Sequence, residues 1–251
     1  MKFNAKLFLL FFVSFGFLLG NTIDNLKIYT EEYPPYNYFN QNKNKVEGIY
    51  VEIVEYILKD NNSKLSGKDI QLVPWARAYR SALTEKNTAI FALTWTEERD
   101  SLFKWVGPVT NTSQVLIAKK NRGIKITKVE DINKYNIGVV RDDVAEQILI
   151  NSGIDSKKIQ QAHSPVLCAR MLEAGRIDLW AYGEGPARFI MRTDFGGFDN
   201  YEVVHILREG EMYIGFHKDT SDEIVNMFRK SLEKLKTVDI DKYNAILKKY
   251  L

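Results

Sequence analysis

Cysteine is nearly absent from this chain, because Cys168 is the only one among its 251 residues. A single cysteine excludes a disulfide within the chain, and no cysteine near the N-terminus offers a site for lipid attachment. Histidine is also scarce: His163, His205 and His217 are the three, and none lies in a metal-binding spacing such as HxxxH. We therefore expect no metal, no cofactor and no lipoprotein, and a fold stabilised by burial of apolar side chains.

A marked excess of one charge is lacking as well. The formal net charge is +3, and Lys2 and Lys6 account for two of these charges. Such a balance excludes the broadly basic surface that nucleic-acid binding requires. Hydrophobic residues make up 45% and charged residues 27%, which is normal for a globular protein. With no exposed apolar stripe in the pattern, we expect a monomer.

Long hydrophobic runs are absent except at the N-terminus. Residues Leu7–Leu19 form an apolar core broken only by Ser14 and Gly16, and Lys2 and Lys6 precede it. This pattern predicts a signal peptide over residues 1–20, with cleavage near Gly20–Asn21. Leu18 fits the small-residue cleavage pattern poorly, so a retained anchor is the alternative. The chain is predicted to be exported.

Strand and helix patterns alternate along the rest of the sequence, which is typical of βα units and a mostly parallel sheet. The segments Leu26–Thr30, Ile70–Val73, Ala89–Leu93, Val115–Ala118, Asn136–Val140, Ile177–Tyr182, Val203–Leu207 and Met212–His217 predict strands. Those at Ile49–Leu58, Ala76–Thr84, Val129–Asn133, Asp142–Asn151, Pro165–Ala174, Ala187–Arg192, Ile224–Leu235 and Tyr243–Leu251 predict helices. Ligands of open α/β sheets bind beyond the carboxyl ends of the strands, so the turns after these strands are the candidate sites.

The turn after Ala89–Leu93 carries the most informative motif, Thr94-x-Thr96-x-x-Arg99. Threonine hydroxyls and free N–H groups at a helix start attract anions, and an arginine can grip both oxygens of a carboxylate. The motif therefore predicts a site for a small carboxylate. An ordinary surface arginine beside acidic neighbours is the alternative interpretation.

This segment resembles the family 3 periplasmic solute-binding proteins, the receptors of polar amino acid ABC transporters. In that family the TxTxxR residues hold the ligand carboxylate, and a segment like Phe103–Pro108 and then Thr112–Lys119 leads to a second lobe. The resemblance covers most of the chain after the signal peptide. It implies a two-lobed α/β fold, the type II periplasmic binding protein, with two crossover hinge segments and a ligand cleft between the lobes.

The lobe boundaries follow from that resemblance. Residues 21–112 with 208–251 form lobe 1, and residues 113–207 form lobe 2. We expect the hinges near Asn111–Val115 and Ile206–Glu209. The implied role is capture of a small solute in the periplasm by lobe closure, the solute being an amino acid or other small carboxylate, for an ABC permease in the inner membrane.

Two aromatic residues match the family positions that cover a ligand. Tyr33 precedes Pro34–Pro35, and Trp75 follows the predicted strand Ile70–Val73. Tyr36 and Tyr38 compete with Tyr33 for this role, and core packing is the alternative for each ring.

The second lobe departs from the family pattern. The position of the Asp that holds a ligand ammonium falls on Gly183, flanked by Tyr182 and Glu184. The usual Gly-Thr turn is replaced by Arg141–Asp142–Asp143, although two aspartates at a helix start are also good caps. We therefore hypothesise that the acidic partner has moved to Asp142, Asp143 or Glu184. A ligand that is not an α-amino acid is the competing hypothesis.

Catalysis is the rival class of function. Glu98 or Glu184 could serve as a general base, but no nucleophile–base pair is recognisable, and Cys168 lies on an apolar helix face as a packed thiol. The sequence thus favours a binding protein over a dehydratase-like enzyme. A receptor domain that signals to a membrane partner would carry the same features and stays open.

Overall fold

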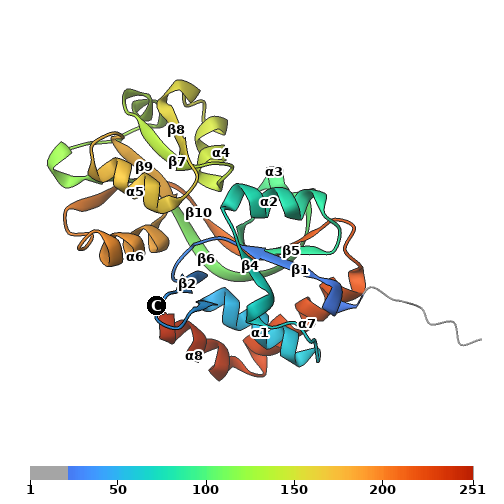
Figure 1. Cartoon of the computed structure of the whole chain (residues 1–251). Coiled ribbons are helices and arrows are strands. Elements are labelled where there is room, and N and C mark those ends of the chain that lie inside the picture. The colour runs from blue at the N-terminus through green and yellow to red at the C-terminus, as the bar shows by residue number, and fades with distance from the viewer. Residues whose placement is uncertain (1–21, 251) are drawn as a thin grey trace, which may run out of the picture.

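A computed structural model of the chain describes residues 22–250, so the predicted signal peptide lies outside the described residues. Figure 1 shows two α/β lobes joined by long strands that cross from one to the other. All the strands except a small hairpin belong to one eight-stranded sheet of order β4-β1-β5-β10-β6-β9-β7-β8. The predicted α/β class and two-lobed architecture are confirmed.

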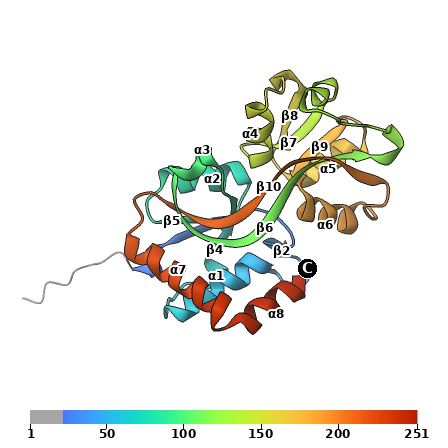
Figure 2. The same ribbon diagram turned by 180° about the vertical axis from the view of Figure 1, so that it is seen from behind.

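Lobe 1 contains a parallel group of strands, β4-β1-β5, extended by one end each of β10 and β6. Every residue of β5 is buried, as its continuous apolar run predicts. Its elements are β1 (Lys27–Thr30), β4 (Ile70–Leu72), β5 (Thr88–Thr94), the hairpin of β2 (Tyr38–Asn40) and β3 (Lys45–Glu47), α1 (Ile49–Asp60), α2 (Trp75–Thr84), α3 (Glu97–Asp100), α7 (Asp222–Thr237) and α8 (Ile240–Tyr250). Seen from behind, α1, α7 and α8 lie together on the side of this lobe away from α2 and α3 (Figure 2).

Lobe 2 repeats the theme with the parallel strands β8-β7-β9. Its elements are β7 (Ile137–Val140), β8 (Ile159–Ala162), β9 (Leu179–Gly183), α4 (Val144–Asn151), α5 (Pro165–Glu173) and α6 (Glu184–Asp194). Ser164 starts α5 by accepting a hydrogen bond from the N–H of Leu167, with Pro165 at the first helical position. The sequence analysis missed β8 and the β2–β3 hairpin, which are short and rich in polar residues.

Two 17-residue strands, β6 (Phe103–Lys119) and β10 (Tyr201–His217), connect the lobes. They pair antiparallel from Tyr201 opposite Lys119 to His217 opposite Phe103, through three register shifts. Only Val115–Ala118 of β6 was predicted as a strand, and β10 was predicted as two, Val203–Leu207 and Met212–His217, because polar residues interrupt the apolar pattern between the lobes. Backbone hydrogen bonds continue across that interruption.

The predicted hinge segments pair with one another in this ladder. Ile206 lies opposite Val115, and Glu209 lies opposite Ser113. One hydrophobic cluster extends from the lobe 1 core into the side of lobe 2 that holds α5 and α6, and a second fills the other face of the lobe 2 sheet. No helix within residues 22–250 combines the length and the hydropathy that a membrane span requires.

Candidate functional site

The parallel strands of both lobes point their carboxyl ends at the same cleft. Thr30 ends β1 and Thr94 ends β5 in lobe 1, while Val140 ends β7 and Gly183 ends β9 in lobe 2. Turns after these four residues supply the side chains discussed below. This is the position at which open α/β sheets bind ligands.

Arg99 is the most deeply placed cation of the cleft, with 1% of its surface exposed. Thr96 caps the short helix α3 by accepting a hydrogen bond from the Arg99 N–H at 3.3 Å, which fixes the arginine backbone. The guanidinium packs over the rings of Tyr79 and Trp75, with its carbon 5.0 and 5.7 Å from their centroids. The sequence therefore placed this residue correctly at the strand edge, buried rather than on the surface.

The Arg99 guanidinium contacts both lobes. Its Nη1 donates to the carbonyl of Thr94 at 3.3 Å in lobe 1. Its Nε donates to Gln147 Oε1 at 3.1 Å, and its Nη2 to the carbonyl of Asp142 at 3.4 Å, both in lobe 2. The acceptors are neutral, so Arg99 forms no direct ion pair through these three bonds.

Trp75 makes a second contact across the cleft. It is the first residue of α2, is buried, and donates from Nε1 to the carbonyl of Asp142 at 2.8 Å. Asp142 has a positive φ of 61°, which turns this carbonyl towards lobe 1 in the turn between β7 and α4. The backbone of Asp142, rather than its exposed side chain, is thus the part that meets the opposite lobe.

Asp143 is buried at the start of α4, with 6% of its surface exposed. Its Oδ1 accepts the N–H of Ala145 at 2.9 Å, so it is the helix cap that the sequence allowed. Burial raises the pKa of this carboxyl, while the Ala145 N–H and the charge of Arg99 act in the opposite direction. Asp143 is the one of the three hypothesised acidic residues that the structure buries beside Arg99.

Glu184 and Arg141 lie away from this cluster. Helix α6 begins at Glu184 instead of Ala187, because a proline at position 186 is tolerated in a first helical turn. Glu184 therefore stands one turn before Arg188 and accepts from its Nε at 2.8 Å. Arg141 is exposed and donates to Gln161 at 3.2 Å.

Glu31 is a site residue that the sequence analysis missed. It follows the last residue of β1 and is 4% exposed. Burial raises the pKa of its carboxyl well above the ordinary value, Asp143 and Glu32 raise it further, and Arg99 lowers it. Its position directly after strand β1 could have indicated a site residue. Two adjacent glutamates are more typical of an exposed loop, so the sequence alone did not single it out.

Aromatic rings fill the space between the lobes. Tyr33 lies edge-on to Tyr182, with centroids 5.4 Å apart, and stacks on Tyr36 at 5.5 Å. Tyr182 stacks on Trp180 at 5.2 Å. All of these rings are buried, so Tyr33 contacts the other lobe directly.

Several buried polar atoms near these rings have no hydrogen-bond partner among residues 22–250. They include Thr30 Oγ1, Gln114 Oε1, Trp180 Nε1 and Tyr182 Oη. Buried polar groups are normally paired, so unpaired ones call for a partner from outside the chain. A cavity of about 250 Å³ lined by Glu31, Trp75 and residues 163–165 opens onto this region.

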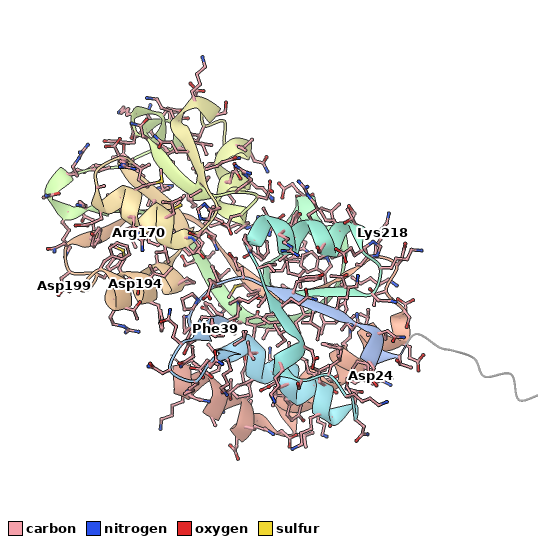
Figure 3. The ribbon with its side chains drawn as sticks, viewed as in Figure 1. Asp24, Phe39, Arg170, Asp194, Asp199 and Lys218 are labelled. Atoms are coloured by element: carbon pink, nitrogen blue, oxygen red, sulfur yellow. The ribbon has the colours of Figure 1, made fainter. Side chains whose placement is uncertain are left out.

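Two wider hollows flank the contact between the lobes. One of about 630 Å³ lies between the β2 hairpin and α5–α6, where Phe39 and Asp194 stand on its two sides (Figure 3). The other, of about 490 Å³, lies at the hinge beside Tyr36 and Glu184.

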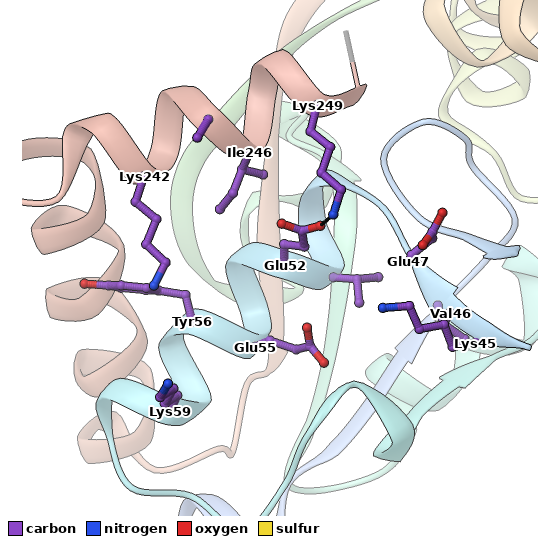
Figure 4. A pocket seen from close by; sticks show the side chains of 12 residues that line it. Lys45, Val46, Glu47, Glu52, Glu55, Tyr56, Lys59, Lys242, Ile246 and Lys249 are labelled. Carbon is purple, nitrogen blue, oxygen red and sulfur yellow. Dashed lines mark hydrogen bonds and ion pairs between the residues drawn. The ribbon is translucent and has the colours of Figure 1, made fainter. Parts of the chain in front are cut away.

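A hollow of about 400 Å³ in lobe 1, between β3, α1 and α8, is a different kind of feature (Figure 4). Its acidic groups are already engaged: Glu52 pairs with Lys249, and Glu47 pairs with Lys43 outside the hollow. Lys242 stacks over Tyr56 at 4.8 Å. Glu55 accepts the N–H of Gly67 at 3.1 Å, so each carboxylate that lines the hollow already has a partner within residues 22–250.

The residues within 22–250 include no group of three or more His, Cys, Asp or Glu side chains arranged to hold a metal ion. Cys168 is buried, and burial raises the pKa of its thiol to about 12. A thiol with this pKa is a poor nucleophile at neutral pH.

Comparison with known proteins agrees with this geometry. The model of the bacterial extracellular solute-binding proteins, family 3, matches residues 26–251. The comparison with curated proteins gave no match.

Solved structures share the fold at low sequence identity. A histidine kinase sensor domain with similarity to periplasmic binding proteins has a TM-score of 0.79 and 20% identity, and the alignment covers 91% of this chain and 97% of that one. A Streptococcus pneumoniae ABC uptake transporter substrate-binding protein with bound histidine has a TM-score of 0.78 and 15% identity, covering 91% and 94%. An ancestral arginine-binding protein bound to glutamine has a TM-score of 0.76 and 20% identity, covering 90% and 97%.

Proposed function

The chain belongs to the bacterial extracellular solute-binding proteins, family 3, and from this premise we propose that it captures a small solute by closing its two lobes around it. The solute is an amino acid or a derivative with a carboxylate group. The periplasm is the proposed compartment, and an ABC permease of the inner membrane is the proposed recipient. Lobe boundaries near residues 112 and 207 are part of the proposal.

The observation that carries the proposal is Arg99. This guanidinium is buried at the meeting point of the lobes and touches Gln147 and the Asp142 carbonyl of lobe 2 as well as Thr94 of lobe 1. All three acceptors are neutral oxygens, so these bonds leave the charge of Arg99 without a direct ion pair. A solute that contacts both lobes shifts the population towards the closed form.

In the proposed mechanism, lobe 1 binds the solute first and lobe 2 then closes over it. The solute first contacts lobe 1, where Arg99 and the end of β5 at Thr94 and Thr96 receive its anionic end. Tyr33 and Trp75 cover its body from lobe 1, and Tyr182 covers it from lobe 2. Asp143 then approaches with lobe 2 and receives a cationic group.

A thermal-shift screen of the protein against amino acids, amines, oligopeptides and organic acids tests the proposal. A ligand at one hundred times its Kd adds about 2.7 kcal/mol to stability, which is a rise of several degrees in Tm for a protein of this size. We expect Arg99→Ala to abolish the shift of the best ligand. The matched control is Arg77→Ala, which removes an exposed arginine on α2. Loss in both variants, or in neither, would contradict the assigned role.

Sensing is the second candidate, because a sensor domain of a histidine kinase has the same fold over nearly its whole length. Gene deletion separates the two roles. Delivery to a permease predicts that cells lacking the gene no longer take up the solute, whereas sensing predicts normal uptake and a lost transcriptional or motility response. Recovery of the bound solute chemically unchanged distinguishes both from a dehydratase-like enzyme.

A further inference from the structure

Buried carboxylates outnumber buried cations where the lobes meet. Arg99 is accompanied by two carboxyl groups that accept no side-chain hydrogen bond within residues 22–250, Glu31 from lobe 1 and Asp143 from lobe 2, and all three residues are nine-tenths or more buried. Glu146 of α4 is buried as well, but its oxygens already accept from the Asp142 N–H and from Gln161. We propose that the solute carries a net charge of +1 and that its cationic group lies between Glu31 and Asp143. This inference rests on the proposed function and specifies the class of solute.

The Glu31 carboxylate is placed to meet a solute. It lines the 250 Å³ cavity together with Trp75 and Pro165, so it is reached from the cleft. Within residues 22–250, no hydrogen bond or ion pair engages its oxygens, although the backbone carbonyl of the same residue accepts from Asn37 at 2.7 Å. A buried carboxylate without donors is costly, because the charge has lost its water and gained nothing in exchange.

Arg99 does not satisfy this demand. Its three hydrogen bonds end on neutral oxygens, those of Thr94, Asp142 and Gln147. Its charge lowers the pKa of both Glu31 and Asp143, which shows that the three groups interact, but burial outweighs this effect and raises the pKa of both carboxyls. One further positive charge balances the site, and the solute is its source.

Three of the four unpaired polar atoms named above suit a cation with N–H groups, whereas Trp180 Nε1 can only donate. Gln114 Oε1 can only accept a hydrogen bond, and Thr30 Oγ1 and Tyr182 Oη can accept one. The faces of Tyr33 and Tyr182 add the electron-rich surface on which ammonium and guanidinium groups bind. A neutral amide or hydroxyl group could also donate to these acceptors, but it would not offset the charge of the two carboxylates.

Two kinds of solute carry one net positive charge. A basic amino acid has two cationic groups and one carboxylate, and the carboxylate would pair with the charge of Arg99. A simple amine or guanidine has one cationic group and leaves Arg99 to its protein contacts. L-arginine and n-butylguanidine represent the two kinds, and L-citrulline is the neutral analogue of arginine with nearly the same shape.

Isothermal titration calorimetry of these three probes tests the inference. We expect at least one cationic probe to bind, and L-arginine to exceed L-citrulline by about tenfold or more in affinity if it is that probe, since a single buried charge contact is worth at least 1.4 kcal/mol. Binding of n-butylguanidine alone identifies the amine class. Binding of both shows that the guanidinium is the group recognised.

Isosteric variants test whether Glu31 and Asp143 are the residues that favour a cationic solute over a neutral one. Glu31→Gln and Asp143→Asn each remove one charge, and asparagine still caps α4. We expect each variant to weaken the cationic probe by about tenfold and to bring the cation-to-neutral affinity ratio close to one. Glu130→Gln is the matched control: Glu130 is exposed in the short helical turn Val129–Lys134 of lobe 2 and lines none of the cavities described above, so the ratio should not change.

Two results would overturn the inference alone. One is binding of L-citrulline or another neutral amino acid as tightly as its cationic partner. The other is an unchanged affinity ratio in folded Glu31→Gln and Asp143→Asn proteins. Failure of every amino acid and amine to bind would instead overturn the proposed function, and the inference with it.

Discussion

Replacing Gly183 by alanine should block closure of the lobes without disturbing either lobe. Gly183 ends β9, and the Tyr33 hydroxyl of lobe 1 occupies the space that a side chain would need. A Cβ atom at this position would lie 3.0 Å from Tyr33 Cζ and closer still to its hydroxyl oxygen. The Gly183 φ of −62° suits alanine, so the backbone adds no strain.

The size of the effect follows from where the collision occurs. Overpacking by one methyl group in a filled interior costs about 1–3 kcal/mol. Tyr33 and Gly183 belong to different lobes, so the collision exists only when the lobes meet, and the cost falls on closure rather than on folding. Ligand affinity should decrease by roughly 5- to 150-fold, while the thermal midpoint of the ligand-free protein should remain within about 2 °C of that of the original.

Calorimetry with the tightest of the cationic probes measures the loss of affinity, and small-angle X-ray scattering at saturating probe measures the separation of the lobes. Gly185→Ala is the control, because a Cβ there meets the Tyr36 hydroxyl at an ordinary 3.6 Å. Adding Tyr33→Phe to Gly183→Ala removes the hydroxyl and should restore part of the affinity. Equal affinity and equal compactness of Gly183→Ala and the original protein would refute the argument.

Three further predictions concern single side chains. Trp75→Phe removes a 2.8 Å hydrogen bond across the cleft to the Asp142 carbonyl and should weaken probe binding by about 2- to 12-fold in calorimetry, equivalent to 0.5–1.5 kcal/mol. Glu31→Gln should raise the Tm at pH 7 but not at pH 4. Burial raises the pKa of this carboxyl in the folded state, so the wild-type protein loses stability as the pH rises above the pKa of the carboxyl in the unfolded chain. Glutamine does not titrate, so the variant does not lose this stability. Glu47→Gln should reduce the acid sensitivity of urea unfolding, because hydrogen bonds and Lys43 hold the pKa of Glu47 at about 2, so that its stabilising effect is present above pH 4.5 and is lost as the pH falls towards 2.

Each of these has a clear contrary outcome. A Trp75→Phe protein with unchanged affinity would mean that the contact contributes nothing to closure. A Tm difference between Glu31→Gln and wild type that is the same at pH 4 and pH 7 would mean that the carboxyl does not titrate differently on folding. Identical pH profiles for Glu47→Gln and wild type would show that the bonds Glu47 accepts from Lys43, Asn40 and Tyr38 do not stabilise the folded state.

Sequence reasoning recovered most of the fold because apolar periodicity reports burial directly. The fully buried run of β5 and the amphipathic pattern of α1 are examples, and the turn at Thr94–Arg99 was found because hydroxyls and an arginine follow a buried strand. The structure brings Arg99, Trp75 and Asp143 together. Whether they hold a solute stays a prediction.

What the sequence could not supply depends on contacts between distant segments. Glu31 is buried because residues of lobe 2 pack near it, and its neighbours along the chain do not indicate that burial. Tyr33 was expected to stack on a ligand, but its hydroxyl faces Gly183, more than a hundred residues away. The pairing of Glu184 with Arg188 was within reach, and it was missed because the start of α6 was placed three residues too late.

The continuous β6–β10 ladder restricts how proteins of this shape can change over evolutionary time. Loops of either lobe can lengthen or shorten freely, since they do not alter the orientation of anything beyond them. Loss of one residue from β6 between Asn111 and Ser113 would turn every following side chain of that strand to the opposite face of the sheet. Lobe 2 would then present another face to lobe 1, so a change of length in either 17-residue strand alters the cleft as a whole, whereas a substitution at one strand end alters a single contact.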